Sequence, residues 1–140
     1  MKILVAADGS SYTKRMLAYL AAHDEWLGAN HNYTVITVVM ALPPRAVAQV
    51  DKEAVKAYYA EEAEKVLKPI RTFCARQGIK ASFVSKVGHA AELIAQQAEA
   101  GKFELLMMGS HGQGSLTNLV MGSVAAKVMA SCRTPLLLVR

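Results

Sequence analysis

The sequence predicts an α/β fold: a single domain, residues 1–140, built on an open, mostly parallel five-stranded sheet with helices on both faces. Short runs of apolar and β-branched residues alternate with longer segments in which apolar residues recur at helical spacing. No repeat, low-complexity segment or linker interrupts the 140 residues, which is an ordinary length for one domain. Such alternation is typical of parallel strands joined by right-handed helical crossovers.

The first strand is expected over residues 2–7 (KILVAA), a continuous apolar run typical of a strand that is covered on both faces. It ends at residues 8–11 (DGSS), where a hydroxyl side chain can cap the helix that follows. That helix is predicted to end near Gly28, and its apolar side carries Met16, Leu17, Leu20 and Leu27. A β-branched run over residues 33–40 (YTVITVVM) predicts the second strand.

A connector over residues 42–50, marked by two prolines, follows the second strand. Asp51 is expected to cap a long helix that closes at Gly78. Pro69 falls inside this helix, and we expect it to kink the helix or to shift its boundaries.

The remaining elements repeat the alternation. The third strand is expected over residues 81–87, a helix over 89–100 and the fourth strand over 103–108. After a glycine-containing stretch, a helix runs to about Cys132, and the last strand covers residues 135–139.

The charge pattern narrows the classes of ligand. The net charge is +5, from 16 Lys and Arg against 11 Asp and Glu, but Lys14 and Arg15 form the only adjacent basic pair. A nucleic-acid surface needs a stripe of basic charge, usually with stacking aromatics. We therefore expect no nucleic-acid partner and favour a small anionic ligand. With no signal peptide and no run of 18 apolar residues, we also expect a soluble, cytoplasmic protein without a membrane partner.

The position of a ligand site follows from the expected topology. In open parallel sheets, ligands bind outside the carboxyl ends of the strands, where the strand order reverses. Three segments should converge there: Asp8-Gly9-Ser10, the connector after Val39, and the stretch after Met108.

The stretch from Met107 to Val124 (MMGSHGQGSLTNLVMGSV) is a candidate for binding phosphate. It contains no GxxxxGK[ST] phosphate loop, no GxGxxG fingerprint and no GxSxG nucleophile elbow. It does contain glycines that let backbone N–H groups approach a ligand, and a helix begins within or just after it. Hydroxyl groups at Ser110, Ser115 and Ser123 add donors. From composition alone, a phosphate cradle and a surface loop with strain-relieving glycines are equally supported.

The spacing of this stretch is written G-x2-G-x9-G-S, from Gly109 to Ser123. Set in MMGSHGQGSLTNLVMGSVAAKV and followed by TPLLLVR, it closely resembles the nucleotide-binding signature of the universal stress protein family. KILVAADGS resembles the opening strand of that family and VGHAAELI its third strand-to-helix turn, so the resemblance covers nearly the whole chain. It implies a Rossmann-like fold, similar to adenine nucleotide alpha hydrolases, that commonly dimerises and in one subclass binds ATP.

The resemblance also implies roles for individual residues. Asp8 and the backbone of Ala6 would flank the adenosine, and the main chain of Val39 would meet the edge of the adenine. Gly109 would lie beside the ribose. The phosphates would be held by Gly112, Gly122 and Ser123.

The chain departs from the family pattern at three places. Gln113 stands where the family frequently has Arg or Lys, Val38 replaces a common His, and no Pro follows Gly88-His89. Magnesium is expected to accompany ATP, although no cluster of carboxylates is apparent. His111 is interpreted as a hydrogen-bonding residue of the loop, because no nucleophile or partner carboxylate can be assigned to it.

The predicted function is a cytoplasmic stress-response module that binds ATP after the fourth strand and acts through dimer and partner contacts, with no particular protein partner indicated. One alternative is a slow ATPase or phosphotransferase that uses the same pocket; no Lys, Arg, Asp or Glu lies between Gly109 and Ser123 to support chemistry. Another is a family member that binds no nucleotide and acts only through protein contacts. The short apolar segment from Thr134 to Val139 predicts a homodimer formed through the carboxyl-terminal strand.

Overall fold

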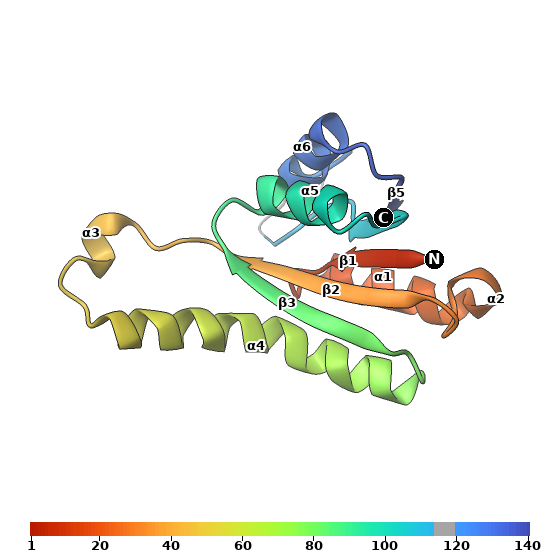
Figure 1. Cartoon of the computed structure of the whole chain (residues 1–140), viewed down its shortest axis with the longest axis horizontal. Helices are drawn as coiled ribbons and strands as arrows, with labels where there is room; N and C mark the ends of the chain where they lie inside the picture. The colour runs from red at the N-terminus through yellow and green to blue at the C-terminus, as the bar shows by residue number, and fades with distance from the viewer. Residues whose placement is uncertain (114–119) are drawn as a thin grey trace.

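The computed structural model describes residues 1–113 and 120–140, and its centre is a five-stranded sheet (Figure 1). The strands are β1 (Lys2–Ala6), β2 (Asn32–Val39), β3 (Ala81–Val87), β4 (Leu105–Gly109) and β5 (Leu136–Val139). Their order is β3-β2-β1-β4-β5, and every neighbouring pair is parallel. The predicted α/β fold is confirmed, and the sheet is parallel throughout.

Helices cover both faces of this sheet. They are α1 (Ser11–Ala22), α2 (Asp24–Leu27), α3 (Pro44–Val47), α4 (Lys52–Arg76), α5 (Ala90–Ala100) and α6 (Ser123–Ser131). Helices α1 and α4 lie against one face, while α5 and α6 lie against the other (Figure 1). Within the described parts of the chain, no helix combines the length and the apolar character needed to cross a membrane.

Strand β1 explains the continuous apolar run at the start of the sequence. Ile3 and Val5 belong to the core on the α1 and α4 side, whereas Leu4 and Ala6 belong to the core on the α5 and α6 side. All four side chains are buried. A strand covered on both faces needs apolar residues at every position, not at alternate ones.

Helix boundaries differ from expectation in two places. The first predicted helix is divided at His23 into α1 and α2, and the connector after β2 contains the short helix α3. Of the two effects expected of Pro69, a kink or a shift of the helix boundaries, the shift does not occur, because α4 runs through Pro69 from Lys52 to Arg76. Pro69 is exposed, and the buried Leu67 and Ile70 pack this part of the helix against the sheet. This packing offsets the backbone hydrogen bond that a proline removes.

The order of the strands places β1 between β2 and β4. The chain runs outward from β1 through β2 to β3 and then returns to β4, so the direction of winding reverses next to β1. The carboxyl ends of β1, β2 and β4 therefore flank the position at which open sheets of this kind bind ligands.

Gly109, the last residue of β4, allows α1 to approach the sheet. A Cβ atom at this position would lie 2.7 Å from Cβ of Tyr12 and 3.2 Å from the carbonyl oxygen of His111. The first contact is closer than packed carbon atoms tolerate, and the second is tight enough that the His111 backbone would have to shift slightly. The glycine is thus required by the packing of α1 on β4, whatever the cavity holds.

We expect Gly109→Ala to destabilise the protein without ligand present. Forcing a methyl group against Tyr12 should lower the free energy of unfolding by about 1–3 kcal/mol, the usual cost of overpacking. Ser11→Ala, an exposed change beside Tyr12, is the control and should stay within about 0.5 kcal/mol of the wild type. Urea unfolding of the three proteins measures both. Equal stability of Gly109→Ala and the wild type would contradict this account of Gly109.

Candidate functional site

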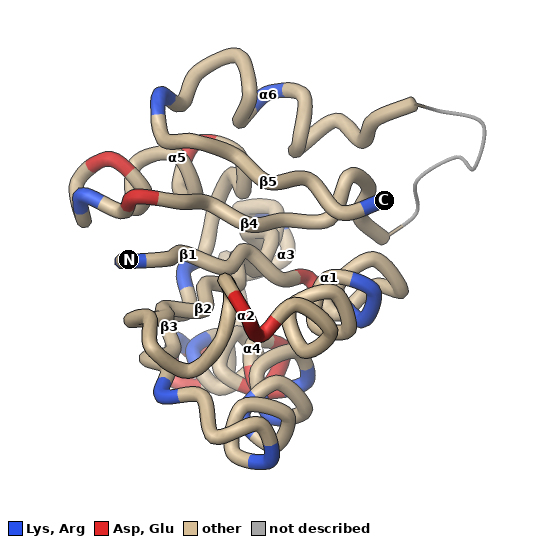
Figure 2. The backbone as a smooth tube through the Cα atoms, turned by 90° about the vertical axis from the view of Figure 1, so that its right-hand side faces the viewer, with Lys and Arg blue, Asp and Glu red and all other residues tan. Residues whose placement is uncertain are grey.

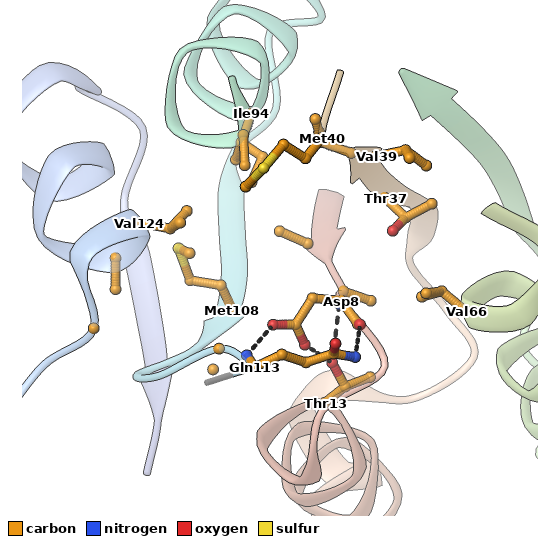
Figure 3. A pocket seen from close by; sticks show the side chains of 18 of the residues that line it. Asp8, Thr13, Thr37, Val39, Met40, Val66, Ile94, Met108, Gln113 and Val124 are labelled. Carbon is orange, nitrogen blue, oxygen red and sulfur yellow. Dashed lines mark hydrogen bonds between the residues drawn. The ribbon is translucent and has the colours of Figure 1, made fainter. Parts of the chain in front are cut away.

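A cavity of about 580 Å³ opens at the carboxyl edge of the sheet (Figure 3). Its walls come from the ends of β1, β2 and β4, from α4 and α5, and from the start of α6. The three segments that the sequence predicted to converge do meet here. All the residues predicted for the site line the cavity, namely Ala6, Asp8, Val39, Gly109, Gly112, Gly122 and Ser123.

The turn after β1 holds the Asp8 carboxylate in a fixed position. Its Oδ1 atom accepts hydrogen bonds from the Ser10 N–H at 2.9 Å and from the Thr13 hydroxyl at 3.0 Å. The same Thr13 oxygen accepts the N–H groups of Asp8 and Gly9. The positive φ of Gly9, +80°, allows the turn.

The expected hydroxyl cap of α1 takes a different form. Ser10 occupies the N-cap position, but its side chain makes no capping hydrogen bond, and its buried Oγ has no partner among the described residues. The hydroxyl that organises this turn belongs to Thr13, in the first turn of the helix. Sequence spacing alone could not distinguish the two hydroxyls.

Gln113 ties the glycine stretch to this turn. Its backbone N–H donates to Asp8 Oδ2 at 3.1 Å, and its side-chain Nε2 donates to the Asp8 carbonyl oxygen at 2.8 Å (Figure 3). A Cβ atom at Gly112 would lie 2.7 Å from Asp8 Oδ2. Gln113, which stands where the family frequently has a basic residue, therefore links the glycine stretch to the turn after β1. The absence of a side chain at Gly112 leaves room for the Asp8 carboxylate.

The start of α6 supplies backbone donors. The Gly122 N–H is already used, since it donates to the Ser110 carbonyl at 2.6 Å, and a Cβ atom there would lie 3.0 Å from the His111 Cα. The first N–H groups of a helix have no carbonyl partner within it. Those of Ser123, Val124 and Ala125, which line the cavity, form a terminus suited to an anion.

His111 and Ser115 are the two remaining residues of the stretch considered in the sequence analysis. His111 Nδ1 is 2.8 Å from the Ser110 hydroxyl, and its ring lies 4.8 Å from the Tyr12 ring between centroids. This agrees with a hydrogen-bonding loop residue. Ser115, which was expected to add a hydroxyl donor, falls outside the described residues.

The end of β2 forms the opposite wall of the cavity. In Figure 3, Thr37, Val39 and Val66 lie on one side and Val124 on the other. The Val39 carbonyl accepts the N–H of Gly88 at 3.0 Å, so one of its two lone pairs is in use. Beyond Val39 the side chain of Met40 is 83% exposed.

Helix α4 contributes a face of the cavity that our sequence interpretation missed. Tyr58, Glu62, Lys65 and Val66 all line it, at the i, i+4, i+7 and i+8 spacing of one helix side. The Lys65 ammonium lies 2.7 Å from Glu62 Oε1, and the hydrogen bond and charge of Glu62 raise the pKa of Lys65. The spacing was a usable signal, but charged residues on a long helix are normally read as a solvent-exposed face.

The charges of the molecule are otherwise dispersed. Lys and Arg positions are spread over α1, α4 and α6 and do not gather in one stripe (Figure 2). Among the residues that the structure describes, Lys65 is the only Lys or Arg lining the cavity.

Comparison with known proteins identifies relatives along the full chain. The model of the Universal stress protein family matches residues 1–140. A universal stress protein of Thermus aquaticus, named for the QAH/OAS sulfhydrylase 3′ region, is 33% identical over 138 residues, covering 99% of this chain and 97% of that protein. Universal stress protein Slr1230 of Synechocystis is 32% identical over 140 residues, and this chain spans only 42% of its length.

Solved structures share the fold. Universal stress protein UspA from Lactobacillus plantarum superposes with a TM-score of 0.78 at 20% identity, covering 100% of this chain and 97% of that chain. A family protein from Arabidopsis thaliana with AMP bound gives 0.72 at 15% identity, covering 99% and 90%. A universal stress protein in complex with cAMP gives 0.65 at 20% identity, covering 100% and 96%.

The match of the family model to the whole chain, and the Thermus relative aligned over almost its full length, agree with the strand order and with the cavity at the carboxyl edge. This chain belongs to the universal stress protein family.

Proposed function

We propose that this chain is a cytoplasmic stress-response module that binds adenine nucleotide, with ATP as its ligand, in the cavity at the carboxyl edge of the sheet. The observation that carries the proposal is the start of α6, where three N–H groups and the Ser123 hydroxyl border a cavity that reaches across to the end of β2. The complexes of two proteins of the same fold with AMP and cAMP support an adenine nucleotide.

The proposed orientation puts the base at β2 and the phosphates at α6. Ala6 and Asp8 would flank the adenosine, the main chain of Val39 would meet the adenine, and Gly109 would lie by the ribose. The phosphates would approach Gly112 and the first turn of α6. Because Gly122 gives its N–H to Ser110, we assign the direct donors to Ser123, Val124 and Ala125, and we assign Gly122 to closing the loop.

Magnesium would arrive with the nucleotide. The carboxylate of Asp8, which lines the cavity, already accepts hydrogen bonds from Ser10, Thr13 and Gln113. In the described parts of the chain, no group of three or more His, Cys, Asp or Glu side chains could hold a metal ion. The residues present therefore do not fit a protein-bound Mg²⁺, whereas Mg²⁺ held mainly by phosphates and water is compatible with them.

Binding with little turnover is the activity that we propose. Hydrolysis needs a positioned water and a charge that stabilises the transferred phosphoryl group. Near the α6 terminus, the Asp8 carboxylate is engaged by three donors and His111 is hydrogen-bonded to Ser110. Backbone donors favour holding an anion over activating a nucleophile.

The proposed module acts as a homodimer through β5. This strand is at the edge of the sheet and pairs only with β4 among the described strands. The carbonyls of Pro135 and Val139 face β4, since they accept the N–H groups of Leu106 and Ser110. Because alternate residues of a strand point their backbone groups to opposite sides, those of Leu136 and Leu138 face outward, where a second copy can pair.

Ser123→Ala is expected to weaken ATP binding and to leave the fold intact. Losing one hydrogen bond to a charged group costs roughly 1.5–3 kcal/mol, which is roughly a ten- to hundredfold loss of affinity. Ser131→Ala, at the other end of α6 and outside the cavity, is the matched control and should bind as the wild type does. Titration calorimetry with ATP and Mg²⁺ measures the three affinities, and phosphate release measures turnover.

Three results would count against this proposal. Absence of ATP binding by the wild type would remove the nucleotide function, and equal affinity in all three proteins would remove the assigned role of Ser123. A wild-type turnover of several per second, lost in Ser123→Ala, would favour an ATPase. Gly122→Val is less informative, because its side chain would press on the backbone at His111.

The dimer is tested by Leu138→Pro. Proline removes an outward N–H donor, which blocks pairing at the edge but leaves the bonds to β4 in place. We expect a dimeric wild type at micromolar concentration and a monomeric variant with unchanged ATP affinity, measured by light scattering after size exclusion. A monomeric wild type would contradict the proposal.

A further inference from the structure

The side chains that line the cavity carry a net negative charge, although the protein as a whole is basic. Among the residues that the structure describes, the Asp, Glu, Lys and Arg side chains of the lining are Asp8, Glu62 and Lys65. No further charged residue occurs between Gly109 and Ser123 in the sequence. The other cations behind the net charge of +5 are spread over the surface of the molecule (Figure 2). An anion in the cavity therefore meets an excess of negative charge.

Lys65 does little to offset that excess. Its Nζ atom lies 2.7 Å from Glu62 Oε1, so these two charges largely compensate each other. The Lys65 side chain is 63% exposed, and water and salt screen the charge of an exposed cation. The charge that is left without a counter-charge is that of the Asp8 carboxylate.

The Asp8 carboxylate lies beside the start of α6. A Cβ atom at Gly112 would be 2.7 Å from Asp8 Oδ2, and the Gly112 nitrogen is 3.5 Å from the position of a Cβ at Gly122, the N-cap of α6. The carboxylate, the Gly112 backbone and the helix terminus are therefore neighbours. Three hydrogen bonds hold the carboxylate in this place, so turning away from a bound anion would break them.

Gln113 satisfies Asp8 without neutralising it. Its backbone N–H donates to Asp8 Oδ2 at 3.1 Å, and its Nε2 donates to the Asp8 carbonyl oxygen at 2.8 Å (Figure 3). Both donors are amides, which carry no net charge, whereas a Lys or Arg side chain in this place would bring a positive charge to the carboxylate. Gln113 thus leaves the charge of this side of the cavity negative.

The net charge of a nucleotide then affects how well it fits. Metal-free ATP carries about twice the negative charge of AMP, and Mg²⁺ bound to the phosphates of ATP cancels about half of its charge. The positive end of a helix is equivalent to only about half an elementary charge. It can attract a phosphate group, but it cannot compensate for a fully ionised triphosphate next to a carboxylate.

We propose that the cavity selects nucleotides by net charge: it binds the Mg²⁺ complex of ATP and discriminates against metal-free ATP, because the neutral Gln113 leaves the Asp8 carboxylate without a counter-charge. This inference rests on the proposed function, which puts the phosphates at Gly112 and the first turn of α6. It names the form of the ligand that the site accepts and the residue that determines this choice.

The test measures the affinity of each protein for ATP with Mg²⁺ and for ATP with EDTA, at low ionic strength, and takes the ratio. Gln113→Lys adds one positive charge beside Asp8. We expect this variant to lower the ratio by about three- to tenfold, mainly through tighter binding of metal-free ATP. In EDTA, the wild type should bind ATP no more tightly than AMP, because the added phosphates bring repulsion as well as hydrogen bonds.

Two control variants separate the charge at this position from other effects. Gln113→Met loses the same side-chain hydrogen bond but stays neutral, and it should keep the ratio of the wild type. Gln77→Lys makes the same change of charge at an exposed residue outside the cavity, at the end of α4. It should also keep the wild-type ratio. Since Gln113 is itself exposed, circular dichroism should show an unchanged fold in all three variants.

Each result either supports or overturns the inference. An unchanged ratio in Gln113→Lys, or an equal fall in either control variant, overturns it, while binding of ATP with Mg²⁺ leaves the proposed function standing. Tighter binding of ATP than of AMP by the wild type in EDTA overturns it as well. If the wild type binds no adenine nucleotide with or without Mg²⁺, both the inference and the proposed function are wrong.

Discussion

The Asp8 carboxylate connects the parts of the molecule that meet at the cavity. It receives hydrogen bonds from the backbone of its own turn, from the Thr13 hydroxyl of α1, and from the backbone of Gln113 after β4. Parallel strands bring their carboxyl ends to one edge, but they do not by themselves determine how the loops beyond them are arranged. Here the Asp8 carboxylate, through its hydrogen bonds, fixes how the loops after β1 and β4 are arranged. The glycine stretch is positioned by its attachment to β1 as well as by its own sequence.

The centre of the sheet could be predicted because β1 and β4 are largely buried and β2 is buried over most of its length, which leaves apolar runs in the sequence. Ile3 to Ala6 alternate between the two cores, and no half-exposed strand reading competes with that pattern. The boundaries of helices were less predictable. Pro69 would be a strong stop signal in an isolated helix, but tertiary packing of Leu67 and Ile70 outweighs it.

The candidate site could be located from sequence but not fully explained by it. The resemblance to the family assigned seven residues to the site, and all seven line one cavity. The sequence could not reveal that Gly109 leaves room for Tyr12, or that the Gly122 N–H donates to the Ser110 carbonyl. Both contacts join residues that are well separated along the chain. The contribution of α4 was missed for a related reason. A charged residue on a helix surface looks the same in sequence whether it faces bulk solvent or a cavity.

The two halves of helix α4 differ in how much they are buried. Its buried residues are Ala63, Leu67, Ile70 and Cys74, which begin close to the midpoint of the helix, whereas the turns before Ala63 contribute none. A 25-residue helix is about 37 Å long, whereas the eight-residue strand β2 that it covers is about 26 Å long. The first turns of α4 therefore extend past the sheet (Figure 1). Mutations in those turns can alter the walls of the cavity at little cost in folding. Relatives could therefore diverge in what they recognise while keeping the same scaffold, with one helix serving as both structural support and adjustable surface.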